Sequence, residues 1–182
     1  MDLSLEQKEA LLKLARDSIL THFEGKLPQM PEDELFRQKR GLFVSLHQGE
    51  ELRGCIGYIK GYNTIAASVV EMARAAAFDD NRFSPISREE MPLITIEISL
   101  LGDLIPVESH AEIQIGRDGL YLQHPYGSGL LLPQVATDWG WDVPTFLRQI
   151  CQKAGLPYGI LQDKQARLFR FTASVFAENQ TF

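Results

Sequence analysis

The chain has 182 residues, of which 45% are apolar and 23% charged, and its formal net charge at pH 7 is −6. The acidic balance argues against broad electrostatic capture of nucleic acid, which needs clustered lysine and arginine. No apolar run approaches the roughly 20 residues of a membrane span. The N-terminus lacks the basic and apolar regions of a signal peptide, and the two cysteines, Cys55 and Cys151, are expected to be reduced thiols. We therefore expect a cytoplasmic protein.

Hydrophobic periodicity predicts three helices and six strands. The predicted helices cover residues 4–23, 64–78 and 143–154. The predicted strands cover residues 41–47, 52–59, 93–101, 112–116, 119–124 and 167–177. Because helices and antiparallel-type strands are mixed without a regular βαβ rhythm, the predicted fold class is α+β, with a largely antiparallel sheet and packed helices.

Side chains that can accept hydrogen bonds from free backbone N–H groups predict where the helices begin. Ser4 and Gln7 have the spacing of a capping box before the first helix. Asn63 is the predicted N-cap of the second helix, and Asp142 that of the third.

The second predicted strand contains the stretch LRGCIGY, which is unusual for a strand because it holds two glycines around a thiol. Alternation along the strand puts Arg53, Cys55 and Gly57 on one face. The opposite face, with its leucine and isoleucine, is the natural core face. Since a cation next to a thiol favours the thiolate, one interpretation is the floor of an anion-binding or thiol-bearing pocket.

The same stretch also has a purely structural interpretation, which accounts for its residues equally well. Cys55 would be a small buried apolar residue, and Arg53 would pair with a structural carboxylate such as Glu97. The glycines would then admit the helix at 64–78 against the sheet.

The two glycines are expected to serve different purposes. Gly54 shares the predicted core face with Leu52, so it should be needed for packing against the helix. Gly57 shares the face of the arginine and the thiol, where it should leave open space. A valine is therefore expected to cost more stability at position 54 than at position 57.

LRGCIGY is also one of several long segments that resemble the AMMECR domain family. The others are GLFVSL, AAAFDDNRFSPIS, SGLLLPQVATDWGWD, FLRQICQKAGLP and LFRFTASVF. They occur in the family's order over nearly the whole chain, which resembles a single AMMECR-type domain over residues 1–182, similar to protein A of the AmmeMemoRadiSam system. The resemblance implies a larger and a smaller lobe around a cleft. It also implies a shared site near that cleft that includes Arg53, Gly54, Cys55 and Gly57.

The resemblance implies partners but no reaction, because the family has no established activity. In prokaryotes the domain is associated with a Memo-type protein and a radical-SAM protein, which are the expected partners. We expect a ligand-binding or accessory protein with a small anionic ligand. The alternative is a thiol-dependent enzyme that uses Cys55, and a nucleic-acid-binding module is the least favoured interpretation. The sequence predicts no cofactor and no metal, since the four histidines are scattered.

Further candidates lie outside the strand. Arg82 could be a second cation over the same cleft or a residue of a solvated loop. Gln134, where an apolar strand gives way to a helix start, could line the ligand site or the surface. Trp139 and Trp141 are expected to fill the core rather than to stack on bases.

Overall fold

The computed structural model describes residues 3–178, which form two compact units. Among these residues, unit 1 comprises 3–101 and 174–178, and unit 2 comprises 102–173. Each unit contains a four-stranded sheet with helices beside it, so the predicted α+β fold class is confirmed. No helix among the described residues has the length and apolarity that a membrane crossing requires.

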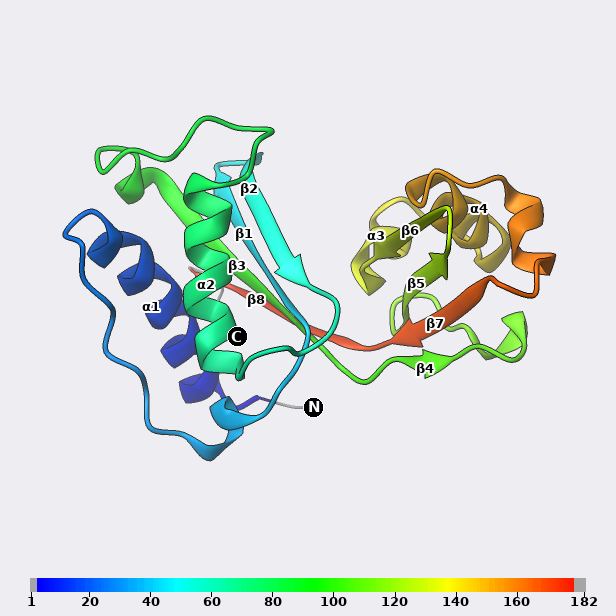
Figure 1. The fold of residues 1–182 in the computed structure, drawn as a ribbon, viewed down its shortest axis with the longest axis horizontal. Helices are drawn as coiled ribbons and strands as arrows, with labels where there is room; N and C mark the ends of the chain where they lie inside the picture. The colour runs from blue at the N-terminus through cyan, green and yellow to red at the C-terminus, as the bar shows by residue number, and fades with distance from the viewer. Residues whose placement is uncertain (1–2, 179–182) are drawn as a thin grey trace. The chain divides into compact units, whose positions relative to one another are not determined.

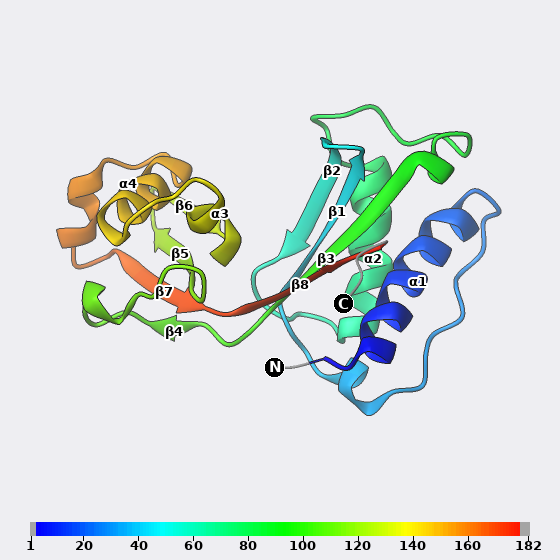
Figure 2. The same ribbon diagram turned by 180° about the vertical axis from the view of Figure 1, so that it is seen from behind.

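Unit 1 is a sheet with the strand order β2-β1-β3-β8 and two helices. The strands are β1 (Leu42–Gln48), β2 (Glu51–Tyr58), β3 (Ile94–Leu101) and β8 (Ala173–Ala177). The helices are α1 (Leu5–His22) and α2 (Ile65–Phe78), with short 3-10 turns at Glu34–Arg37 and Met91–Leu93. Both helices lie on one face of the sheet, and no described helix of unit 1 lies on the other face (Figures 1 and 2). We call this other face the open face.

Side chains of β1 alternate between the two faces of the sheet. Leu42, Val44 and Leu46 are fully buried in the core under α1 and α2, whereas Ser45 and His47 are half-buried on the open face. The core of unit 1 therefore lies between the sheet and the helices.

The approach of α2 to the sheet is close because both surfaces carry small residues. A Cβ added at Gly54 would collide with the carbonyl oxygen of Ala76. Gly54 therefore lies against α2, as expected from the sequence.

A β-bulge in β2 changes the predicted alternation. Leu46 pairs with Gly54, but the next residue, His47, pairs with Leu52, so Arg53 is the extra residue. Leu52 consequently shares the face of His47 and is 36% exposed. The prediction that Leu52 faces the core is wrong, because the bulge shifts the alternation by one residue.

Gly57 has no open space beside it. It pairs with Phe43 on β1, and a Cβ added at Gly57 would collide with the Phe43 ring and with the carbonyl oxygen of Leu42. The predicted cavity at Gly57 is therefore occupied by an aromatic side chain.

Unit 2 is a sheet with the strand order β4-β7-β5-β6 and its own helices (Figure 1). The strands are β4 (Ile105–Pro106), β5 (Gly119–His124), β6 (Gly127–Leu131) and β7 (Arg167–Phe171). The helices are α3 (Pro133–Asp138) and α4 (Val143–Lys153), with 3-10 turns at His110–Glu112 and Tyr158–Gln162. A separate apolar core, which includes Phe146 and Ile150 of α4, packs against β5.

Two predicted strands differ from the structure. Residues 112–116 do not form a strand, because the N–H of Gln114 donates to the buried carboxylate of Asp118 at 2.9 Å and the chain turns there. The predicted strand at 167–177 is interrupted at Thr172, and its halves, β7 and β8, belong to different sheets.

Helix caps follow the sequence with one exception. The Ser4–Gln7 capping box forms, and Asp142 caps α4 by accepting from the N–H of Thr145. The cap of α2 is Thr64 rather than Asn63, since Thr64 Oγ1 accepts from the N–H of Ala67.

Candidate functional site

Arg53 is held by the loop that follows α2. Its Nη2 donates to Oε1 of Glu90 at 2.9 Å and approaches the carbonyl oxygen of Ser84 at 3.5 Å. The pKa of Glu90 is lowered by hydrogen bonding from the N–H of Ser87 and then from Arg53. The structural interpretation therefore fits this arginine, but its partner is Glu90 rather than Glu97.

Both polar groups of the Cys55 main chain are bound by this loop, at the free edge of β2. Its N–H donates to Oδ2 of Asp80 at 2.9 Å, and its carbonyl oxygen accepts from Nη2 of Arg82 at 3.1 Å. Arg82 also donates to both carboxylate oxygens of Asp80, at 2.9 and 2.7 Å. These bonds from Arg82, followed by those from the backbone N–H groups of Cys55 and Arg82, hold the pKa of Asp80 well below its usual range. The structure thus brings Arg82 to Cys55, as a support of its backbone.

The thiol of Cys55 lies in a row of polar side chains on the open face. Ser45 on β1 is the register partner of both Cys55 on β2 and Glu97 on β3. Ser45 Oγ donates to Cys55 Sγ at 3.2 Å. Because directly opposed residues point to the same face of a sheet, these three side chains form a continuous line across three strands, which we call the Cys55 row.

Glu97, at the end of the Cys55 row, is partly removed from water. Burial raises the pKa of Glu97, and the nearby imidazole of His47 acts in the opposite direction. His47 is the next open-face residue along β1 and pairs with Thr95 beside Glu97. A thiol, a hydroxyl, a carboxyl and an imidazole therefore occupy adjoining positions and can donate or accept hydrogen bonds from one ligand.

Residues 3–178 contain no group of three or more histidine, cysteine, aspartate or glutamate side chains arranged to hold a metal ion. The side chains in and beside the Cys55 row are therefore described as hydrogen-bonding groups and not as metal ligands.

The other predicted residues lie elsewhere. Gln134 is at the start of α3 in unit 2, directly after Pro133, so the predicted helix start is confirmed, and this residue belongs to a different unit from Cys55. Trp139 is 72% exposed and stacks on the half-buried Trp141, with ring centroids 6.3 Å apart. The prediction that Trp139 fills the core is wrong.

Sequence reasoning missed Ser45 as a member of the site and gave Glu97 a different role. Both occupy polar positions in alternating strand segments, so their face could be predicted from the sequence. The register that places Ser45 between Cys55 and Glu97 could not be predicted from the sequence, because it depends on pairing between segments far apart in the chain.

Comparison with known proteins agrees with the motif resemblance. A family model described as AMMECR1 matches residues 12–176. A protein of Methanothermobacter thermautotrophicus is 42% identical, with 97% of each chain covered. Protein MJ0810 of Methanocaldococcus jannaschii is 39% identical over 97% of this chain and 92% of its own. The crystal structure of the uncharacterized protein PH0010 from Pyrococcus horikoshii has a TM-score of 0.88 at 36% identity, covering 97% of this chain and 94% of that one. The chain therefore belongs to the AMMECR1 family.

Proposed function

We propose that this AMMECR1-family protein binds a small polar ligand on the open face of unit 1, with the Cys55 row as the floor of the site. The observation that carries the proposal is the register that aligns Cys55, Ser45 and Glu97 across three strands. A structural role alone does not require a thiol, a hydroxyl and a carboxyl with a raised pKa to share one face.

The charges around the row favour particular contacts. The Arg53 side chain is 17% exposed and bound to Glu90, whereas the Arg82 side chain is 54% exposed. If the ligand carries an anionic group, Arg82 is the better partner, because its outer surface is accessible while it supports Cys55. A glutamate with a raised pKa can donate a hydrogen bond when protonated, so Glu97 suits a neutral oxygen of the ligand.

Protection of the thiol tests the proposal. Cys55 would be alkylated with iodoacetamide in a Cys151→Ala background, with and without nucleotides, dicarboxylates and amino acids at millimolar concentration. We expect at least one compound to slow the alkylation of Cys55, and the Ser45→Ala variant to weaken this protection.

The matched control is a thiol placed on an exposed position of unit 2. In a Cys55→Ala, Cys151→Ala, Lys153→Cys variant, the same compounds should leave the alkylation rate unchanged, because Lys153 is exposed on α4. The proposal is wrong if no compound slows Cys55 more than this control thiol.

The second candidate function is thiol-dependent catalysis by Cys55. The observation that favours it is the bond from Ser45 Oγ to Sγ, with His47 at the next open-face position of β1. An activated thiol reacts at neutral pH, whereas an ordinary one gains reactivity only toward about pH 8.5. The rate of Cys55 alkylation is measured against pH with His47 present and in His47→Ala. A catalytic Cys55 is alkylated rapidly at neutral pH and more slowly in His47→Ala, whereas a thiol that only lines a binding site gains reactivity toward about pH 8.5 in both.

The proposed partners, a Memo-type protein and a radical-SAM protein, rest on the family resemblance. If the protein acts with them, each should co-purify with the tagged chain when expressed together. The Cys55→Ala variant should retain this association, since the proposal gives the thiol a role toward the ligand and not toward the partners.

A further inference from the structure

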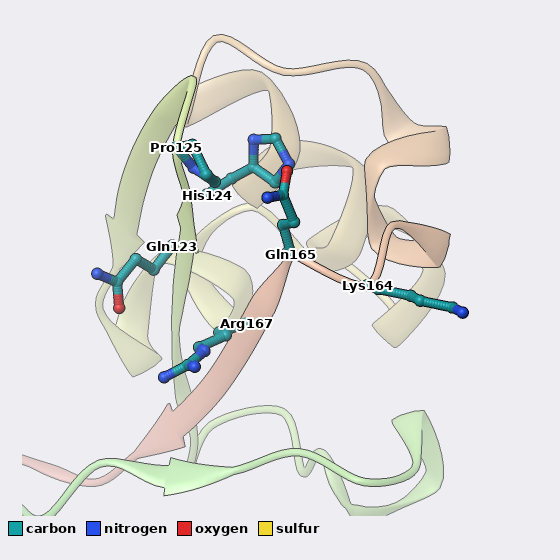
Figure 3. A pocket seen from close by; sticks show the side chains of 6 residues that line it. All are labelled: Gln123, His124, Pro125, Lys164, Gln165 and Arg167. Carbon is teal, nitrogen blue, oxygen red and sulfur yellow. The ribbon is translucent and has the colours of Figure 1, made fainter.

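A cavity of about 420 Å³ lies within unit 2, where β5 ends and the chain enters β7 (Figure 3). The two segments that line it are adjacent because Gln123 of β5 pairs with Arg167 of β7. The lining residues are Gln123, His124, Pro125, Lys164, Gln165 and Arg167. This volume is within the usual range for sites that hold small molecules.

His124 lies in the wall of the cavity, and its side chain is fully buried there. The residue is 6% exposed, and its Nδ1 accepts from the N–H of Tyr126 at 3.2 Å. A neutral imidazole has one protonated nitrogen, so this bond assigns the proton to Nε2. Within residues 3–178 Nε2 has no hydrogen-bond partner. Asp163 Oδ1 lies 3.9 Å away, beyond hydrogen-bonding distance.

Two of the six lining residues are cationic and none is acidic, in a chain whose net charge is −6. Lys164 and Arg167 line the cavity, both are exposed, and neither forms an ion pair with another described residue. In Figure 3 the Lys164 side chain extends away from the others, and its four-carbon stem is flexible enough to turn toward a ligand. Arg167 and Gln123 project from neighbouring strands.

We propose that this cavity binds a small phosphate ester. Arg167 would hold the phosphate through its planar fork of N–H groups, and Lys164 would add a second positive charge. The imidazole of His124 has no accessible surface, so the exposed Gln165 side chain would shift and let a neutral oxygen of the same ligand accept from Nε2–H. An anionic oxygen is disfavoured there, because the Asp163 carboxylate faces the same nitrogen at 3.9 Å.

The two amide side chains at the cavity fit a ligand with hydroxyl or carbonyl groups. Gln123 and Gln165 each offer donors and an acceptor. The backbone N–H of Gln165 donates to Asp163 Oδ1 at 2.8 Å, which fixes that carboxylate near His124. The site therefore discriminates between the charged and the neutral ends of a ligand.

Nuclear magnetic resonance on the full chain with ¹⁵N-labelled histidine tests this proposal. Glycerol 3-phosphate, ribose 5-phosphate and uridine 5′-monophosphate would each be titrated beside its dephosphorylated form. We expect at least one ester to shift the Nε2 resonance of His124 and to bind about tenfold more tightly than its dephosphorylated form, as a charge-assisted contact to Arg167 requires.

Variants separate the two contacts. Arg167→Gln should weaken binding about tenfold. His124→Asn keeps an acceptor near the position of Nδ1 for the Tyr126 N–H but removes the Nε2 donor, so it should weaken binding severalfold. Because the smaller side chain leaves a gap at a buried position, the titration is made at a temperature where the thermal midpoint shows the variant to be folded. Lys153→Gln removes a positive charge from α4, outside the cavity, and should leave the affinity unchanged.

The proposal is overturned if no ester shifts the His124 resonance, or if Lys153→Gln weakens binding as much as Arg167→Gln. Acetate and succinate form a further arm, and the assignment to phosphate esters is wrong if either binds as tightly as the best ester. The site is separate from the Cys55 row, so Ser45→Ala should leave the titration unchanged.

Discussion

The backbone N–H of Cys55 and the carboxylate of Asp80 are joined by a hydrogen bond of 2.9 Å. The Asp80 side chain is 3% exposed and is held by Arg82, which also bonds the carbonyl oxygen of Cys55. β2 is an edge strand, so one side of its backbone has no strand partner in the sheet. The loop after α2 satisfies these groups at Cys55 and positions the thiol on the open face.

Replacing Asp80 by asparagine should therefore destabilise unit 1. We expect Asp80→Asn to lower the free energy of unfolding at pH 7 by about 1–3 kcal/mol, measured by urea denaturation. The amide has one acceptor oxygen where the carboxylate has two, so its NH₂ group would face the N–H groups of Arg82 or of Cys55. Asp79→Asn changes an exposed neighbour and should cause no comparable loss.

The effect of Asp80 should depend on pH with a defined sign. Hydrogen bonds from Arg82 and from the backbone hold the pKa of Asp80 below its ordinary value of 3.8, so the unfolded chain takes up the proton first as the pH falls. The stabilisation is complete above that value and is lost below it. The gap between wild type and Asp80→Asn should shrink between about pH 5 and pH 3. A gap that stays constant over this range would show that the charge contributes nothing.

The ion pair of Arg53 with Glu90 should contribute modestly to stability. The two side chains are 17% and 31% exposed, so solvent screens part of their attraction. A double-mutant cycle of Arg53→Ala and Glu90→Ala should give a coupling of about 0.5–1 kcal/mol in the free energy of unfolding. A coupling near zero would contradict the structural role of Arg53 and would favour its assignment to an anionic ligand.

The two glycines of β2 should both resist substitution, for different reasons. Gly54→Val would press on the carbonyl oxygen of Ala76 in α2, and Gly57→Val on the Phe43 ring and the Leu42 carbonyl oxygen. We expect each to cost about 3 kcal/mol or more in the free energy of unfolding.

A second background separates the two positions. With Phe43→Ala in place, Gly57→Val should recover part of its loss, whereas Gly54→Val should recover none. If Gly57→Val is neutral in the wild-type background, the packing of Phe43 on Gly57 is wrong.

The contrast between these glycines shows how far the sequence alone could lead. The packing of Gly54 can be predicted, because an alanine-rich helix beside a strand glycine indicates close packing. The surroundings of Gly57 cannot, because the ring that covers it comes from β1 and only the register places Phe43 opposite it. The face of Leu52 is predicted wrongly, because no residue of LRGCIGY indicates a bulge at Arg53.

The candidate site follows the same division. The alternation in β1 and β3 predicts that Ser45 and Glu97 each lie on the polar face of their strand, and the sequence also indicates Cys55 on β2 as a candidate. Which carboxylate meets Arg53 could not be predicted, since the choice between Glu90 and Glu97 is made by the course of the loop after α2. Local periodicity predicts on which face of the sheet a residue lies, whereas contacts between segments far apart in the chain determine which residues meet in a site.

Glu97 links stability to the proposed ligand site. Burial raises its pKa above the ordinary value of 4.5, so the folded protein holds the proton more tightly than the unfolded chain. Ionisation therefore disfavours the folded state, and the free energy of unfolding falls as the pH rises through the interval between the two pKa values. Glu97→Gln removes this loss. We expect the variant to be more stable than wild type at pH 8, by a few tenths to about 1 kcal/mol, with a gap that narrows toward pH 4.

Urea denaturation at pH 4, 6 and 8 measures the gap, and Glu89→Gln, an exposed carboxylate before β3, is the control that should show none. In the same variant, the compound that protects Cys55 from alkylation should protect it less, because the carboxyl at the end of the Cys55 row is gone. A variant that is more stable but protects the thiol less would show that Glu97 serves the ligand site and reduces the stability of the fold. If Glu97→Gln instead loses stability at pH 8, the charge of Glu97 is compensated within the fold, for which His47 is the nearest candidate, and the carboxylate belongs to the structure rather than to the site.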